Sequence, residues 1–365
     1  MQKKLIALAV ASLVSAPVFA QSTVSVYGVV DQAITNQSQS NRGSVTSLQG
    51  SGYTTERLGF KGSEDMGNGM KANFMLELGM KGPNGNLDNA QAAPAQLFQR
   101  VSTVGLSGNW GSVNFGRQYT PVFSVQAAND LFRVAGVGSI YSLTNVGVTR
   151  SSNSIRYDSA SMSGFSVAVL YGLGDTGLGN VSTDTPLTAP LVGNNPSNLG
   201  RQVGFNAMYN NGPLMIGLGW NRLNLPAITA APLNTFDSQK TTSLTASYDF
   251  KVVAINAGWQ NNKITDNLQD RNTWNIGATI PVFGADSVKV SYADRHDKLV
   301  NSADVKLLAL GYVHPMSKRT TLYGTYAKLK NDNNSAQGFI FGAPGTNVLG
   351  GYGPNAFQLG MSHNF

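Results

Sequence analysis

Segments in which apolar and polar side chains alternate recur along this chain, and they constrain its fold more than any other feature. Each segment is about ten residues long and ends at a cluster of Gly, Asn, Asp, Ser or Pro, as β-strands usually do. Sixteen such segments lie near residues 23–35, 54–65, 69–81, 97–109, 112–121, 152–162, 164–174, 201–211, 213–224, 240–250, 252–263, 272–282, 287–298, 303–314, 320–331 and 355–365. The pattern predicts an all-β protein.

Two kinds of connection alternate between these segments. Short turns such as Met66-Gly67-Asn68 and Asn211-Gly212 are followed by connections that are mostly long and polar, such as 36–53, 122–151 and 175–200. Seven short turns and eight longer loops correspond to sixteen antiparallel strands with both chain ends on the short-turn side. Outer-membrane barrels have this asymmetry, with short periplasmic turns and long extracellular loops.

The length of the segments favours a membrane barrel over a soluble fold. A tilted strand of about 9–11 residues spans the hydrocarbon layer, whereas strands of soluble proteins are typically about 5–6 residues long. A soluble β-sandwich or propeller also alternates, but no blade signature repeats at a fixed period. No stretch after residue 20 approaches the apolar length of a spanning helix. Lipid requires every strand edge to be paired, so the sequence predicts a closed 16-stranded antiparallel transmembrane β-barrel with an aqueous lumen.

The alternation also assigns faces to the strands. Lipid-facing positions are predicted for Val24, Val26, Gly28, Val30, Met70, Ala72, Phe74, Leu76, Leu78, Val253, Ile255, Ala257 and Trp259. Lumen-facing positions are predicted for Ser25, Tyr27, Asp31, Lys71, Asn73, Glu77, Asn256 and Gln260. The segments near 303–314 and 320–331 alternate too poorly to assign. The terminal Phe365 is expected on the lipid face at the periplasmic rim, where aromatic girdles form and the last strand closes against the first.

The first twenty residues have the order of a signal peptide. Lys3 and Lys4 precede an apolar stretch, 5–14, and small residues lead to Ala20. We therefore expect cleavage after Ala20 and a single barrel domain over 21–365. Removing two lysines changes the excess of bases from 26 minus 19 to 24 minus 19, or +5. These bases are scattered, which disfavours nucleic-acid binding. The chain has no Cys, and we expect no cofactor and no metal.

Several stretches resemble the Gram-negative general porins, specifically their β-proteobacterial type. They are "SVYGVVDQAI", "ERLGFKGSEDMGNGMKANFMLELG", "RVSTVGLSGNWGSVNFGRQYTPVF", "NSIRYDSASMSGFSVAVLYG", "PMSKRTTLYGTYA" and the terminal Phe. The resemblance implies an outer-membrane homotrimer, a third loop folded inward as a constriction, and passive diffusion of ions and small hydrophilic solutes. It also implies contact with outer-membrane lipid and lipopolysaccharide, and with the barrel assembly machinery, which reads a terminal aromatic residue.

Selectivity in such a pore is set at its narrowest point, where low-dielectric walls focus the field of a few charges. The third loop, about 122–153, carries one acid, Asp130, and two bases, Arg133 and Arg150. The resemblance points to Arg100 and Arg117 as arginines of the barrel wall that face this loop. Candidate residues at and around the constriction are therefore Arg57, Arg100, Arg117, Asp130, Arg133 and Arg150, with Tyr27, Asp31, Lys71, Glu77 and Tyr119 lining the pore.

For each of these arginines, and for Arg156, the alternative is a solvated side chain with no role in transport. The excess of bases at the constriction predicts a mild preference for anions.

Three rival functions remain open from the residues alone. An enzymatic barrel would need a catalytic constellation, and the nearest approach to one is Asp294, His296 and Asp297; we expect no enzyme activity. A substrate-specific channel would need a series of inward aromatic residues, and only Tyr27 and Tyr119 are candidates. A plugged barrel would need an additional domain, for which the sequence leaves no room.

Overall fold

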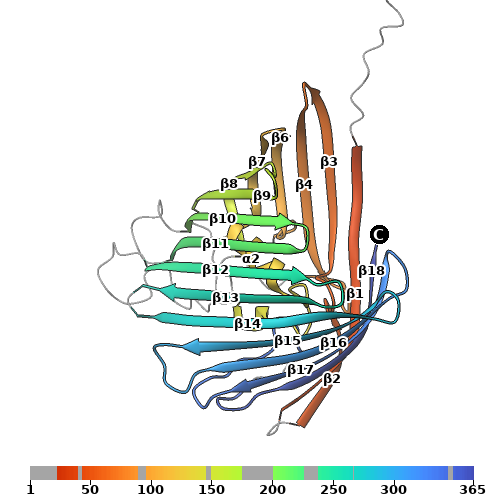
Figure 1. Cartoon of the computed structure of the whole chain (residues 1–365), viewed down its shortest axis with the longest axis vertical. Helices are drawn as coiled ribbons and strands as arrows, with labels where there is room; N and C mark the ends of the chain where they lie inside the picture. Colours follow the sequence, from red (N-terminus) through yellow and green to blue (C-terminus); the bar gives the residue numbers. More distant parts are fainter. Residues whose placement is uncertain are drawn as a thin grey trace, which may run out of the picture.

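The computed structural model describes residues 23–39, 43–88, 96–144, 149–174, 200–225, 237–265, 267–343 and 348–365. The expected signal peptide, 1–20, lies outside these residues. The wall consists of sixteen strands that follow one another around a barrel (Figure 1). They are β1 (Thr23–Gln39), β3 (Arg57–Gly67), β4 (Met70–Lys81), β6 (Val101–Gly108), β7 (Gly111–Tyr119), β8 (Arg150–Ser159), β9 (Phe165–Leu173), β10 (Arg201–Asn211), β11 (Leu214–Leu225), β12 (Asp237–Asp249), β13 (Ala254–Ile264), β14 (Gln269–Val282), β15 (Asp286–Asp297), β16 (Val305–Pro315), β17 (Thr320–Asn331) and β18 (Asn355–Asn364).

The first strand closes the ring by pairing on both sides. Residues 23–29 of β1 pair with β3, and residues 29–38 pair with β18, all antiparallel. Beyond the last strand, Phe365 and Gly28 exchange two backbone hydrogen bonds of 3.1 Å. The predicted 16-stranded antiparallel barrel is therefore confirmed.

The predicted alternation of faces is also confirmed. Val24 and Val26 are 66% and 58% exposed on the outer surface, whereas Asp31 is fully buried. Ile255 and Trp259 point outward from β13, while Asn256 and Gln260 are buried inside. The outer surface is thus apolar, as contact with acyl chains requires.

Four further elements lie in the long connections. β2 (Gly43–Gly50) pairs with residues 32–39 of β1, and the short β5 (Asn86–Leu87) pairs with β4. The third loop, which we call L3, contains two helices, α2 (Pro121–Asn129) and α3 (Tyr141–Thr144). No helix in the described ranges is both long and apolar enough to cross a membrane.

The only sizeable apolar core among the described residues lies inside the barrel, between L3 and the wall. Phe132, Val137, Ile140 and Leu143 of L3 pack against inward side chains of β15–β18, such as Leu307. This packing explains why the segments 303–314 and 320–331 could not be assigned. Both faces of these strands are apolar because the inner face touches L3 rather than water.

Candidate functional site

L3 leaves the wall at Tyr119 and begins with a helix that runs along the inner wall (Figure 1). Thr120 caps α2 by accepting a hydrogen bond from the amide of Phe123, and Pro121 occupies the first turn, as helix starts favour. Val122 and Val125 lie against Gly219 of β11, where a Cβ would come within 3.0 Å of both residues. The absence of a side chain at Gly219 therefore lets α2 approach the wall closely.

Amide side chains fix α2 to the wall along its length. Asn206 of β10 donates to the carbonyl of Pro121 at 2.8 Å, and Gln126 donates to Gln260 of β13 at 2.6 Å. At the end of the helix, Asn129 donates to Asn275 of β14 at 2.6 Å. These buried polar contacts hold L3 inside the lumen without a covalent link.

The tip of L3 reaches across to the strands where the barrel closes. The amide of Gly136 donates to the carbonyl of Ser51 at 2.8 Å, and the amide of Val137 donates to Gln358 of β18 at 2.9 Å. L3 thus covers the inner faces of β10–β18. The open part of the lumen faces the inner wall of β3, β4, β6, β7 and β8.

Arginine side chains gather on that open wall around one tyrosine. The hydroxyl of Tyr119 accepts hydrogen bonds from Arg100 at 2.7 Å and from Arg150 at 2.8 Å. Arg150 also lies over the ring of Tyr119, with its guanidinium carbon 4.4 Å from the ring centroid. Arg57 lies within electrostatic reach of Arg100 and donates to Thr54 and Thr55. We call Arg57, Arg100 and Arg150 the wall arginines.

One acid accompanies the wall arginines. Glu77 of β4 accepts from Arg100 Nε at 2.6 Å and from the hydroxyl of Tyr27 at 2.9 Å. Both side chains of the ion pair are almost fully buried. Glu77 therefore neutralises Arg100. Among the described side chains, no acid forms an ion pair with Arg57 or Arg150, so both remain uncompensated charges on the wall.

The acid of L3 is turned into the loop itself. The carboxylate of Asp130 accepts from the amides of Phe132 at 2.9 Å and Val134 at 3.3 Å, and from the hydroxyl of Ser139. Burial raises the pKa of Asp130 above its ordinary value, although these hydrogen bonds oppose the shift. Asp130 is only 7% exposed and organises the loop instead of presenting charge to the lumen.

The charge that L3 does present is positive. Arg133 and Val134 both adopt the left-handed backbone region, with φ of 61° and 56°. This turn places Arg133 over the ring of Tyr53, where Nη1 donates to the hydroxyl at 3.1 Å. Lys289 of β15 lies over the same ring and donates to the carbonyl of Leu131 at 2.7 Å. Basic side chains therefore lie both on the open wall and beside L3.

Comparison with known proteins agrees with this geometry. Residues 7–334 match the family model described as Gram-negative porin. The chain belongs to the Gram-negative porin family. Outer membrane porin protein 32 of Delftia acidovorans is 34% identical over the full length of both chains, and an outer membrane porin protein of Bordetella pertussis is 27% identical, covering 90% of this chain and 94% of its own. A solved structure described as an anion-selective porin from Comamonas acidovorans is 31% identical, with a TM-score of 0.79 over 94% of this chain and all of that one. The porin described here is an outer-membrane diffusion channel of a Gram-negative bacterium.

The structure places the remaining predicted site residues of the porin in different surroundings. Asp31 faces inward, but its carboxylate accepts from three successive amides, 52–54, and from Tyr323, so it fastens the wall. Arg117 donates to the carbonyl of Gln99 at 2.5 Å and to Ser152 at 2.8 Å instead of to Tyr119. Lys71 is exposed near the turn that joins β3 and β4.

A recess of about 490 Å³, lined by both polar and apolar residues, lies beside Tyr119 of the porin. Tyr119, Lys61 and Asn73 are among its lining residues, together with the ion pair between Arg156 and Asp158. Its lining comes from β1, β3, β4, β6, β7 and β8, the wall that L3 leaves open.

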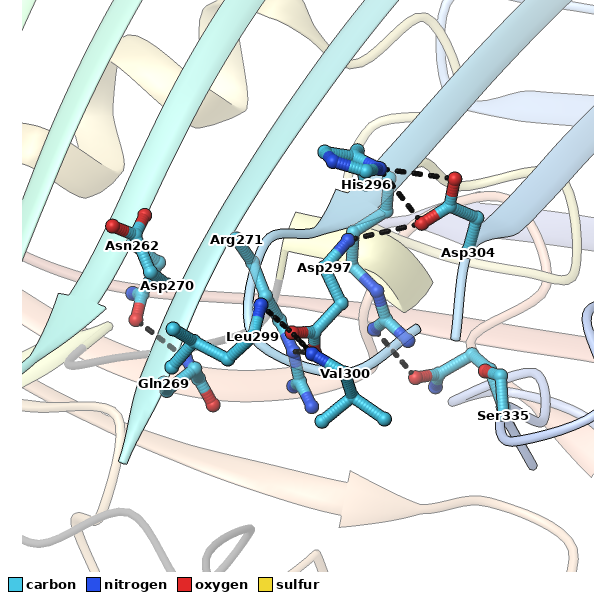
Figure 2. A network of polar contacts seen from close by, with 12 residues as sticks. Asn262, Gln269, Asp270, Arg271, His296, Asp297, Leu299, Val300, Asp304 and Ser335 are labelled. Atoms are coloured by element: carbon cyan, nitrogen blue, oxygen red, sulfur yellow. Dashed lines mark hydrogen bonds and ion pairs between the residues drawn. The ribbon is translucent and has the colours of Figure 1, made fainter. Parts of the chain in front are cut away.

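The rival catalytic constellation does not assemble in the porin. His296 pairs with Asp304 at 2.9 Å, and Asp297 instead accepts from Arg271 and from the amides of Leu299 and Val300 (Figure 2). Asp294 forms an ion pair with Lys306. These residues stabilise the ends of β14, β15 and β16 at the long-loop rim.

Sequence reasoning missed Lys289. The signal was available, because Val288, Val290 and Tyr292 are apolar at alternate positions and place Lys289 on the opposite, inward face.

Proposed function

We propose that this porin favours anions among the small hydrophilic solutes that diffuse through it. The observation that carries the proposal is the charge distribution at the constriction. The opening is flanked by Arg57 and Arg150 on the wall and by Arg133 and Lys289 on the loop side. The acid beside them, Glu77, forms an ion pair with Arg100. The description of the Comamonas relative as anion-selective supports the same direction.

The size of the effect follows from Coulomb's law. Two unit charges 4 Å apart interact with about 1 kcal/mol in bulk water and about 4 kcal/mol near a protein surface. A difference of about 1.4 kcal/mol is a tenfold change in partition. Two or more uncompensated guanidinium groups are therefore sufficient for a several-fold preference, even after partial screening.

Solute flux tests the proposal independently of electrical recording. Liposomes that contain the purified porin are placed in isotonic solutions of a sugar acid, a neutral sugar and an amino sugar of equal size, and their swelling rates are compared. We expect the sugar acid to enter fastest and the amino sugar slowest. Faster entry of the amino sugar would refute the proposal.

Processing and assembly are part of the same proposal. We infer that residues 1–20 are removed as a signal peptide and that the mature barrel forms a homotrimer in outer-membrane lipid and lipopolysaccharide. The apolar outer surface of β1, with Val24, Val26 and Ile34 exposed, suits a subunit contact. Phe365, exposed at the rim, suits recognition by the assembly machinery. Cross-linking of the purified protein would show whether three copies associate.

A further inference from the structure

Asp31 is an inward acid of β1 that organises the segment between β2 and β3. Its Oδ2 accepts from the amides of Tyr53 at 3.0 Å and Thr54 at 2.7 Å, and its Oδ1 accepts from the amide of Gly52 at 3.0 Å. The side chain is fully buried and, among the described residues, forms no ion pair. Successive amides that converge on one carboxylate make an anion-binding concavity, and such bonds are stronger than those between neutral groups. The carboxylate therefore fixes the backbone of 52–54.

The same carboxylate fixes two aromatic rings. Oδ1 of Asp31 also accepts from the hydroxyl of Tyr323 on β17 at 2.6 Å. The ring of Tyr323 stacks on the ring of Tyr53, with centroids 5.5 Å apart and planes inclined at 25°. The rings fit because residue 52 is a glycine, where a Cβ would lie 2.2 Å from the hydroxyl of Tyr323. Asp31 thus holds Tyr53 through its amide and Tyr323 through its hydroxyl.

Tyr53 in turn contacts the cations beside L3. The guanidinium carbon of Arg133 lies 4.9 Å from the centroid of the Tyr53 ring, and Nζ of Lys289 lies 5.4 Å from it. Arg133 also donates to the Tyr53 hydroxyl at 3.1 Å. Arg133 is exposed, so its long side chain would have many conformations without these contacts. The position of the ring therefore sets the position of the Arg133 charge, and it contributes to that of Lys289.

The same segment holds the backbone at the tip of L3. The amide of Gly136 donates to the carbonyl of Ser51 at 2.8 Å, and Gly136 has a φ of 64°. A Cβ at this position would lie 2.1 Å from the carbonyl oxygen of Gly52. Glycine permits both the left-handed backbone and the close approach. Contacts therefore run without a break from Asp31 through 51–54 to L3.

We propose that Asp31 is a positioning residue for ion discrimination, because it places Tyr53 and Tyr53 places the cations beside L3. The proposal rests on the anion preference proposed above and adds to it a residue that no solute touches. The charge of Asp31 is buried and held by four donors, so it acts through the position of its neighbours. Charge alone gives the opposite expectation, since removal of an inward acid should raise the preference for anions.

The test compares Asp31→Asn with the wild type in the full-length mature porin. The single carbonyl oxygen of Asn cannot accept from all four donors, so the segment 51–54 loses part of its support. We expect the permeability ratio of chloride to potassium to fall about twofold. In an Arg133→Ser background, Asp31→Asn should change the ratio much less, because the charge that Asp31 positions is already absent.

The matched control is Asp286→Asn on β15. The carboxylate of Asp286 also accepts from a tyrosine hydroxyl, that of Tyr312, and from His314 at 2.8 Å. Asp286 shares the parity of Val290, which is exposed on the outer surface. The control therefore makes the same chemical change outside the lumen, and its permeability ratio should equal that of the wild type.

A spin label reports the position of L3 without reference to ions. The chain has no Cys, so a label attached at Val134→Cys, next to Arg133, is the only one. We expect the label to be more mobile with Asp31→Asn than without it, and unchanged with Asp286→Asn. A wild-type porin that shows no anion preference would refute the proposed function, whereas the label would still decide the role of Asp31.

Three results would overturn the proposal: a rise in anion preference with Asp31→Asn, a change in the ratio with no change in label mobility, or a more mobile label with an unchanged ratio. Heat-modifiable electrophoretic mobility reports whether each variant is folded. If Asp31→Asn does not fold, Tyr53→Ala replaces it, because it removes the ring and keeps the amide that Asp31 binds. The same fall in the ratio is expected for Tyr53→Ala, and Tyr53→Phe, which keeps the ring, should retain most of the wild-type preference.

Discussion

Arg150 is stacked on Tyr119 and hydrogen-bonded to it, with the guanidinium carbon 4.4 Å from the ring centroid and Nη2 2.8 Å from the hydroxyl. The stacked ring and the hydrogen bond together hold a long flexible side chain in one position on the wall. The charge of Arg150 is therefore held in a fixed position on the open wall of the lumen.

Replacing Arg150 by Ser should weaken the anion preference. The substitution removes one uncompensated charge whose interaction with a nearby anion is about 1 kcal/mol or more, so the permeability ratio of chloride to potassium should fall at least about twofold. The measurement is the zero-current potential in planar bilayers. Arg319→Ser, at an exposed turn on the opposite rim, removes the same charge and should leave the ratio unchanged.

Replacing Glu77 by Gln should act in the opposite direction. The substitution frees the charge of Arg100, so the anion preference should rise by a similar factor. Breaking a buried ion pair also costs about 3–5 kcal/mol, although Gln keeps an oxygen that can accept from Tyr27. We expect a lower thermal midpoint of the folded barrel, read by electrophoresis after heating. A variant with unchanged stability and a permeability ratio shifted toward cations would contradict the role of Glu77 as the acid that neutralises Arg100.

Replacing Asp130 by Asn should change stability more than selectivity. Its carboxylate is buried and accepts from Phe132 and Ser139, so its charge acts within L3. The introduced amide group cannot accept as many hydrogen bonds, and an unsatisfied buried group costs about 1–3 kcal/mol. Faster proteolysis of L3, with a permeability ratio near that of the wild type, is the expected result. A large rise in anion preference would mean that the charge of Asp130 reaches the lumen.

Replacing Gly28 by Ala should impair barrel closure. An added Cβ would lie 2.3 Å from the ring of Phe365 and 2.8 Å from the carbonyl of Arg57, and the backbone carbonyl cannot move aside easily. The control is Gly324→Ala on β17, where the nearest atom is 3.8 Å away. We expect a smaller folded fraction for Gly28→Ala after refolding in detergent, and a wild-type fraction for Gly324→Ala. Equal yields would show that the contact between Gly28 and Phe365 does not limit closure.

The wall of the barrel was largely predictable from the sequence because each strand has one side in lipid and the other in water. Polarity therefore changes at every residue, and the segment 201–211 matches β10 at both ends. The prediction was incomplete where water is absent from the inner face. Leu307 is buried against L3 and Leu308 is exposed outside, yet the two residues look alike in the sequence.

The interior of the loop was not predictable to the same degree. The sequence Thr120-Pro121 is a helix start, but only the structure shows α2 on β10–β13. Whether Asp130 faces the lumen depends on hydrogen bonds that form after the loop folds back, such as that from Ser139. The sequence shows that bases outnumber acids around L3. Only the tertiary contacts show which of these charges are not neutralised by an ion pair.

The central claim is that fixed positive charges set the selectivity of a water-filled channel. Its most direct test is the zero-current potential of the purified wild-type porin across a planar bilayer, with KCl at about 0.1 M on one side and about 0.01 M on the other, where screening lengths are about 10 and 30 Å. We predict that the dilute compartment becomes negative because chloride crosses faster than potassium. A positive dilute compartment would contradict the account.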